Sequence, residues 1–396
     1  MKKLSQRQKR LLIKRAVNGN RKHILRLYSS RPTVEGSTSI ILLNGEFHRV
    51  KVRGVARHPP SSLDFEDNYH STLSYLESLR KNFAVRKNSK MGWVFRESWP
   101  GGGLYIRDYT DYSKIEGIST SAALVLTAEY DRARELINST PPAIDLHKWN
   151  KRVFTALFEL GFFELLGLSE DVGIKYSTSG DLRTMRIVSG SSTEELAQAS
   201  NQIMELSKFI YGEVGLPSKY LKEVTTAICE GLSNVTGWAY PSNYRFKYLP
   251  VGRWWVTASA HRVNRTLTIA LYDQGASIPV TFAAKPTKSL PVRLLSFLQN
   301  ALNSTEAEEY ANDAAYIEGA LRFGASSTGL DNRGQGLPQM RELIDFVGGG
   351  SISVLSRAGR CSYEHGGGVV RESCGTSVGG TLVEWRLALP AIAEDG

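Results

Sequence analysis

Residues 228–241 have the sequence ICEGLSNVTGWAYP and end a stretch with the apolar spacing of a helix. The apolar positions of this helix are Leu221, Val224, Ile228, Leu232 and Val235. At about 100° per residue these positions share one side, whereas Glu230 and Asn234 lie on roughly the opposite side, one turn apart. Two polar residues placed in this way either face solvent or converge on one ligand.

Three later segments carry glycines beside predicted strands or helices. The strand over 265–272 runs into DQGASIP (273–279), where an Asp at a strand end suits a buried polar contact with a ligand. The segment NRGQGLPQM (332–340) is a glycine loop that opens a helix, and backbone N–H groups there favour phosphate. The segment GGTLVEWRL (379–387) leads from two glycines into an alternating strand.

In this order the four motifs resemble the GHKL ATPases, a family that includes DNA gyrase B, Hsp90, MutL, histidine kinases and anti-sigma factor serine kinases. The resemblance covers about 190–390. It implies an α/β fold class, with a histidine kinase-like ATPase domain over 173–396. That domain is expected to be a two-layer α/β sandwich, the Bergerat ATP-binding fold, with a mixed sheet. The stretch EGLSNVTGWAYP is closest to the anti-sigma kinase pattern EAxxNxxxHxY, with Trp238 at the His position.

The resemblance implies a role for each matched residue. Glu230 is the expected general base, and Asn234 is the expected ligand of Mg²⁺. Asp273 is expected to accept a hydrogen bond from the adenine amino group of ATP, and Gly275 to leave room for the base. The other expected nucleotide-binding residues are Ile278, Arg333, Gly334, Gln335, Gly336, Leu337, Gly380 and Thr381.

Two further expectations concern the loops of this half. The family has a second glycine where this chain has Ser277, so we expect a tighter nucleotide pocket. The segment 280–333 is the expected ATP lid, which nucleotide would order.

Residues 37–172 alternate between strand and helix patterns. We expect a hairpin over 37–55 around Asn44-Gly45, a short helix over 70–83, a helix over 118–137, a strand over 143–146 and an apolar helix over 151–168. This alternation predicts an α/β unit.

The same segment resembles a STAS domain, the fold of anti-sigma factor antagonists. The stretch ISTSA (118–122) matches that family's Ile-Asp-Ser-Ser-Gly motif, which places the phosphorylated residue at Thr120. Ser119 and Ala122 depart from the motif. The alternative interpretation is that Ser119, Thr120 and Ser121 only cap a helix.

The positive charge of the chain is concentrated at its N-terminus. Residues 1–60 contain fifteen Lys or Arg against Glu35 and Glu46, while the whole chain of 396 residues carries +10. The remainder is therefore slightly acidic. Residues 1–36 are expected to form a basic helical arm, and residues 1–57 could bind nucleic acid through its phosphates. A solvated arm, or a helix packed on an acidic partner, explains the same charge.

The overall composition, with 41% apolar and 22% charged residues, is ordinary for a soluble globular protein. No apolar window is long enough for a membrane span, and no signal peptide is recognisable. Cys229, Cys361 and Cys374 follow no CxxC spacing. We therefore expect free thiols in a reducing, cytoplasmic protein.

Two functions are consistent with these motifs. The first is a Mg-ATP-binding regulator of the partner-switching type, which hydrolyses ATP or phosphorylates a Ser or Thr of a protein partner. The second is a non-kinase switch, in which ATP drives closure and homodimer formation while the basic arm binds a partner. Transfer of the γ-phosphate to Thr120, Ser121 or a partner would separate the first from the second.

Overall fold

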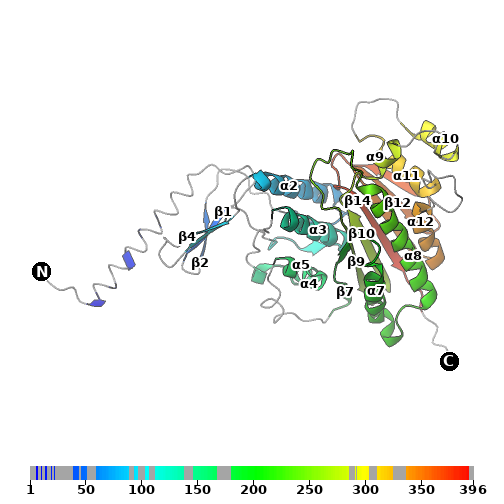
Figure 1. The fold of residues 1–396 in the computed structure, drawn as a ribbon. Coiled ribbons are helices and arrows are strands. Elements are labelled where there is room, and N and C mark those ends of the chain that lie inside the picture. Colours follow the sequence, from blue (N-terminus) through cyan, green and yellow to red (C-terminus); the bar gives the residue numbers. More distant parts are fainter. Residues whose placement is uncertain are drawn as a thin grey trace.

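The computed structural model describes residues 39–43, 46–50, 59–88, 93–96, 103–106, 112–137, 146–166, 180–284, 290, 292–302, 310–323 and 336–391, with a few isolated positions before residue 23. Its centre is an eight-stranded sheet in the order β13-β12-β11-β14-β10-β9-β7, with β8 also paired to β9 (Figure 1). The strands are β7 Leu182–Thr184, β8 Val188–Gly190, β9 Trp254–His261, β10 Thr266–Asp273, β11 Gly350–Ser356, β12 Gly359–Glu364, β13 Val369–Ser373 and β14 Thr381–Ala388.

All described pairings in this sheet are antiparallel, so the expectation of a mixed sheet is wrong for the described residues. The reason is local. A short turn joins β9 to β10, another joins β11 to β12, and strands joined by a short turn can pair only in the antiparallel sense. The strand expected over 265–272 is confirmed as β10, and its antiparallel neighbour is β9.

One face of the sheet, called the inner face here, is covered by helices of the C-terminal half. These are α7 Leu196–Tyr211, α8 Ser218–Asn234, α9 Ile278–Ala283, α10 Val292–Ala301, α11 Asp313–Phe323 and α12 Gly336–Val347. Alternate strand residues such as Val256, Leu271 and Trp385 join Ile228 and Leu343 in one core. The apolar residues predicted to share one side of the helix before residue 235 lie on the side of α8 that packs into this core. Leu221 is only partly buried there.

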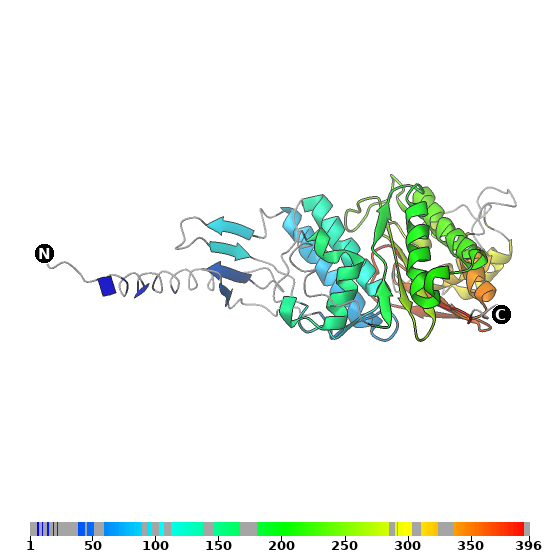
Figure 2. The ribbon, with the colours of Figure 1, turned by 90° about the horizontal axis from the view of Figure 1, so that it is seen from below.

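The opposite, outer face is covered by helices of the N-terminal half. These are α2 Tyr69–Asn88, α3 Thr120–Ile137, α4 Lys151–Leu160 and α5 Phe162–Leu165. They share a second core with Trp255, Tyr272, Leu355 and Leu382 of the sheet. Figures 1 and 2 show three layers, with the sheet between two sets of helices. The two-layer sandwich expected for residues 173–396 corresponds to the sheet and its inner helices, and the N-terminal helices add the third layer.

The outer helices follow their sequence signals with two differences. Helix α2 runs to Asn88 and is longer than the predicted 70–83. The predicted helix over 151–168 is interrupted at Gly161, whose φ of 91° is left-handed and whose N–H caps α4 at Leu157 and Phe158. A left-handed residue ends a helix because the chain leaves the helical path, and glycine adopts it without a steric penalty.

A separate sheet of four strands lies in the N-terminal segment, in the order β2-β1-β5-β4. Its strands are β1 Ser39–Leu43, β2 Glu46–Val50, β4 Trp93–Arg96 and β5 Gly103–Ile106. Pairing of Leu43 with Glu46 confirms the predicted hairpin. The strands β3 Ser62–Leu63 and β6 Gly117–Ile118 pair in parallel beside α3.

Two predicted segments of this half fall largely outside the described residues. The predicted strand 143–146 lies outside them except for Leu146, which begins a 3₁₀ turn. The basic arm over 1–36 lies outside them except for isolated positions.

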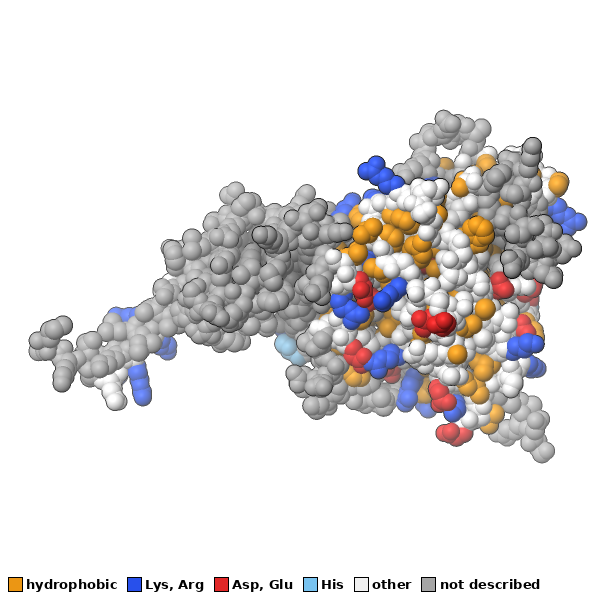
Figure 3. Space-filling view, viewed as in Figure 1, with side chains coloured by type: hydrophobic (Ala, Val, Ile, Leu, Met, Phe, Trp, Pro, Cys, Tyr) orange, Lys and Arg blue, Asp and Glu red, His pale blue; other side chains and the backbone are white. Residues whose placement is uncertain are grey.

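The described surface matches the near-neutral charge of residues beyond 60. Figure 3 shows the molecule from the same side as Figure 1. On its described part, Lys and Arg side chains are interspersed with Asp and Glu, with hydrophobic side chains between them. Among the helices that the structure describes, none is long and apolar enough to cross a membrane.

Candidate functional site

The C-terminal turn of α8 and the start of α12 meet at Glu230, Asn234 and Gly336, which we call the Glu230 cluster. A Cβ built on Gly336 would lie 3.0 Å from Glu230 Oε2 and 3.1 Å from Asn234 Nδ2. Glycine therefore allows the backbone at the start of α12 to approach the carboxylate and the amide together. The two polar residues predicted one turn apart are half-buried and converge on this helix N-terminus.

The Asn234 side chain is unusual within this cluster. Its Nδ2 atom is buried and has no hydrogen-bond partner among the residues that the structure describes. A buried amide group without a partner is costly in a folded protein, and such a group commonly marks a site that a ligand, ion or water completes. A rotation of the amide exchanges its nitrogen and oxygen, so the side chain can present either atom.

The second group of predicted residues surrounds Asp273 at the end of β10. Asp273 pairs with Thr381 of β14, and Asp273 Oδ1 accepts a 2.7 Å hydrogen bond from the Gly275 N–H. A Cβ on Gly380 would lie 1.9 Å from the Asp273 carbonyl oxygen, so only glycine fits there. We call Asp273, Gly275, Gly380 and Thr381 the Asp273 cluster.

The Asp273 side chain is only 5% exposed. Burial raises the pKa of its carboxyl group to about 7, although the N–H groups of Gly275 and Thr381 partly oppose this shift. A buried carboxyl that titrates near neutrality can accept a hydrogen bond from an amino group, and such a donor would favour its ionised form.

Hydroxyl groups extend the Asp273 cluster toward α9. Thr381 Oγ1 and Ser356 Oγ lie 2.8 Å apart, and Ser356 Oγ accepts a 2.8 Å hydrogen bond from the Ile278 N–H. Ile278, predicted from the resemblance, is thus joined to Thr381 through Ser356. No local sequence pattern points to Ser356, because it lies 78 residues beyond Ile278 in the chain.

A π-helical turn over Val235–Ala239 joins the two clusters. The Ala239 carbonyl oxygen accepts a 2.7 Å hydrogen bond from the Ala276 N–H, and a Cβ on Gly275 would lie 2.5 Å from the Ala239 Cβ. Tyr240 Oη donates to the Arg253 carbonyl oxygen and accepts from the Gln274 N–H. The end of α8 is therefore fixed directly to the segment that follows Asp273.

Two departures from the family pattern have clear structural settings. Trp238 lies in the π-helical turn and is 54% exposed. Ser277 has φ 82° and ψ 156°, a backbone conformation that belongs almost only to glycine. Its buried Oγ also lacks a hydrogen-bond partner within the described part of the chain. The chain therefore keeps a glycine-like backbone at residue 277 although it carries a side chain there.

The remaining predicted site residues have mixed outcomes. Leu337 is 9% exposed and belongs to the inner core, so its side chain points into the fold. Arg333, Gly334 and Gln335 lie outside the described residues, as do parts of the predicted lid at 285–289, 291, 303–309 and 324–333. The described parts of the lid form α9, α10 and α11.

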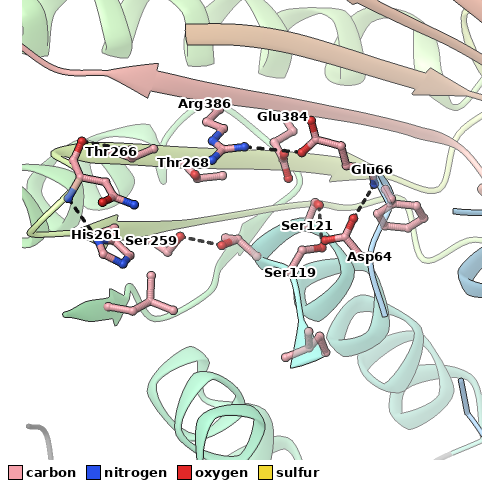
Figure 4. A pocket seen from close by; sticks show the side chains of 15 residues that line it. Asp64, Glu66, Ser119, Ser121, Ser259, His261, Thr266, Thr268, Glu384 and Arg386 are labelled. Atoms are coloured by element: carbon pink, nitrogen blue, oxygen red, sulfur yellow. Dashed lines mark hydrogen bonds and ion pairs between the residues drawn. The ribbon is translucent and has the colours of Figure 1, made fainter. Parts of the chain in front are cut away.

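Thr120 and Ser121 lie at the N-terminus of α3, on the outer face of the sheet. Thr120 Oγ1 is 2.6 Å from Ser259 Oγ on β9, and it lines a cavity of about 230 Å³. Figure 4 shows Asp64, Glu66 and Glu384 around this cavity, with Arg386 turned toward Glu66. These hydroxyls are separated by the sheet from the Glu230 cluster on the inner face.

No protein-family model matches the chain, and no curated protein is significantly similar to it in sequence. The function must therefore be argued from the geometry of these clusters. A carboxylate, an amide and a helix N-terminus meet in the Glu230 cluster, and a buried carboxyl bordered by glycines lies beyond the π-helical turn. In chemical terms the helix N-terminus suits an anionic group, and the buried carboxyl suits a hydrogen-bond donor.

Proposed function

We propose that this chain is a Mg-ATP-binding regulatory protein with a GHKL-type ATP site, which hydrolyses ATP or transfers phosphate to a partner protein. The proposal rests chiefly on one observation, the convergence of Glu230, Asn234 and Gly336 with a buried, unpartnered amide on Asn234. The four sequence motifs also support the proposal, because their order resembles that of the GHKL ATPases. In this proposal the phosphates lie near the start of α12 and the base lies near Asp273.

The chain's own residues have distinct tasks in this proposal. Asn234 supplies a ligand oxygen for Mg²⁺, which neutralises charge on the phosphates when it is bound. Glu230 accepts the proton of the attacking water or hydroxyl, as a general base within reach of the phosphate side. Asp273 accepts a hydrogen bond from the adenine amino group, and Gly275 and Gly380 let the backbone around it pack closely against Ala239 and Asp273. Gly336 allows the α12 N–H groups to approach the phosphates.

The acceptor of the phosphate is water or a separate polypeptide. Thr120 and Ser121, which the STAS resemblance singled out, lie on the outer face of the sheet, whereas Glu230 lies on the inner side. Carboxylates of Asp64, Glu66 and Glu384 around Thr120 also oppose a doubly charged phosphate there. Phosphorylation of Thr120 from this chain's own ATP site is therefore not part of the proposal.

The position of Thr120 and Ser121 on the outer face, away from Glu230, favours a second candidate function. ATP binding could serve a conformational or dimerisation switch, with hydrolysis only limiting its lifetime. This non-kinase switch uses the same Asn234 and Asp273 contacts. It differs in leaving no phosphoprotein.

The test uses the full chain with γ-labelled ATP and Mg²⁺, and it scores free phosphate, labelled chain and labelled partner separately. Asn234→Ala should weaken Mg-ATP binding by about tenfold to a hundredfold, because one buried ligand contact is lost. Asn201→Ala, an exposed Asn on α7, is the matched control. Unchanged affinity in the Asn234 variant, measured by calorimetry, would remove the ATP site from this cluster.

A second variant separates binding from chemistry. Glu230→Gln should retain Mg-ATP affinity within about threefold while turnover falls by about 10²–10⁴, since a general base contributes that much. Glu223→Gln, two turns earlier on α8, is the control. Full turnover in the Glu230 variant would show that another group takes the proton.

A further inference from the structure

Arg80 is among the largest fully buried side chains and connects three separate parts of the chain. It extends from α2, and its Nε donates a 2.8 Å hydrogen bond to Glu129 Oε1 on α3. Its Nη1 donates to the Ser377 carbonyl oxygen at 3.1 Å, and its Nη2 donates to the Val378 carbonyl oxygen. One guanidinium therefore joins α2 and α3 to the loop that precedes β14.

This loop leads directly into the Asp273 cluster. Gly379 has φ 87°, and a Cβ there would lie 2.6 Å from Arg80 Cζ. The next residue, Gly380, lies against the Asp273 carbonyl oxygen, and Thr381 pairs with Asp273. Only Gly379 and Gly380 separate the carbonyl groups held by Arg80 from the strand partner of Asp273.

The two chain neighbours of Asp273 are also tied to α3. Tyr272 Oη lies 3.3 Å from Glu129 Oε1 and 3.2 Å from the Val378 carbonyl oxygen. Gln274 Nε2 donates to the Ala128 carbonyl oxygen at 3.5 Å. The residues before and after Asp273 thus contact the outer layer, while Asp273 itself belongs to the cluster on the inner side.

The centre of this network is an ion cluster away from solvent. Glu129 is fully buried and is paired with both Arg80 and Arg132. Burial opposes ionisation of Glu129, but the adjacent Arg132 and Arg80 outweigh it and lower the pKa of this carboxyl. A buried ion cluster depends on the placement of every member, because removal of one leaves an uncompensated charge.

We propose that Arg80 is a positioning residue for the Asp273 cluster, through which docking of α2 and α3 controls recognition of the adenine amino group. This inference rests on the proposed ATP site. Arg80 touches no nucleotide. It acts by fixing the 377–380 loop and, with Glu129, the strand end that carries Asp273.

The first test compares ATP with purine riboside triphosphate, which lacks the 6-amino group. Arg80→Lys keeps the positive charge but cannot reach Glu129 and two carbonyl groups together. It should weaken Mg-ATP binding by about tenfold and leave binding of the amino-free nucleotide within about threefold. The control is Arg134→Lys, since Arg134 lies on α3, is 43% exposed and pairs with Asp131 rather than with Glu129 or the loop.

The ratio of the two affinities separates positioning from general destabilisation. A variant that is only less stable would lose both nucleotides equally, and that outcome would overturn the proposal. Thermal unfolding of each variant establishes that it is folded at the assay temperature.

The second test needs no variant, so it stands even if Arg80→Lys fails to fold. Amide hydrogen exchange of the unmodified full chain is compared with and without Mg-ATP. We expect protection at Asp273 and Thr381 and also in α2 around Arg80 and α3 around Glu129. If only residues on the inner face were protected, the proposed coupling of α2 and α3 to the Asp273 cluster would be overturned, while the proposed ATP site would stand. Absence of protection at Asp273 and Thr381 as well would overturn the proposed ATP site.

Discussion

At the residue scale, Asp273 makes the stability of the protein depend on pH. Its carboxyl has a pKa near 7 in the folded chain and near 3.8 as an unperturbed group. Between these values the folded state holds a proton that the unfolded state has released. The contribution of Asp273 to stability is therefore fully present below about pH 4 and is lost as pH rises through about 7.

Asp273→Asn should remove this dependence while keeping an acceptor for the Gly275 N–H. We expect the unfolding free energy of the native chain to fall by about 1–4 kcal/mol relative to the variant between pH 4 and pH 8. Urea unfolding at several pH values measures the difference. Asp181→Asn, at an exposed ion pair with Arg262, is the control. Parallel pH profiles for the native chain and the Asp273 variant would contradict the prediction.

Residues of the two clusters could be predicted where the signal is local. Glu230 and Asn234 are one helical turn apart, and Asp273 and Gly275 flank one strand end, so short spacings identify them. Arg80 and Glu129 are 49 positions apart, and Arg80 and Val378 are 298 apart. No spacing rule links such positions, because their contact depends on how the outer layer packs against the sheet.

At the element scale, α8 passes very close to the sheet. A Cβ on Gly231 would lie 2.3 Å from Leu271 Cδ2 and 3.0 Å from Met340 Cε. This close approach fixes how far from the sheet the neighbouring residues Glu230 and Asn234 lie, and so how they face α12. A glycine in a helix interior costs up to about 1 kcal/mol relative to alanine, so here it serves packing rather than helix formation.

Gly231→Ala should therefore destabilise the protein by about 1–3 kcal/mol, because the added methyl group overpacks the core. Gly237→Ala is the matched control, since Gly237 has no atom within 4 Å of its built Cβ. That control should change stability by less than about 1 kcal/mol. Chemical denaturation compares the two variants. If Gly231→Ala were as stable as the control, α8 would have room to move away from the sheet.

Most elements of the C-terminal half could be predicted from periodicity, whereas their details could not. The strands β9 and β10 and the helix α12 follow simple alternation or helical spacing. The short strands β7 and β8, for example, are separated by residues 185–187, and no simple alternation marks that break. The π-helical turn over Val235–Ala239 was also not predicted, because a single wide turn leaves no periodic trace.

At the scale of the whole molecule, the outer face of the sheet has two halves of different character. The half near Asp273 is apolar, with Trp255, Tyr272 and Leu382 packed beneath α2 and α3. The other half is polar, with Ser259, Thr268 and Glu384 lining the cavity beside α3. Apolar contact with the N-terminal helices is thus concentrated at the end of the sheet that carries the candidate site.

This arrangement predicts that residues 173–396 do not form a stable unit alone, although the motifs place the whole ATP site within them. The fragment would expose Trp255, Tyr272, Leu355 and Leu382, each worth about 1.5–3 kcal/mol when buried. Their combined loss is comparable to a typical total stability of about 5–15 kcal/mol. We expect the fragment to lack a cooperative calorimetric transition, whereas a control fragment, 39–396, retains one. A cooperative transition in 173–396 would mean that the inner core suffices, and that the outer layer is an attachment rather than part of the fold.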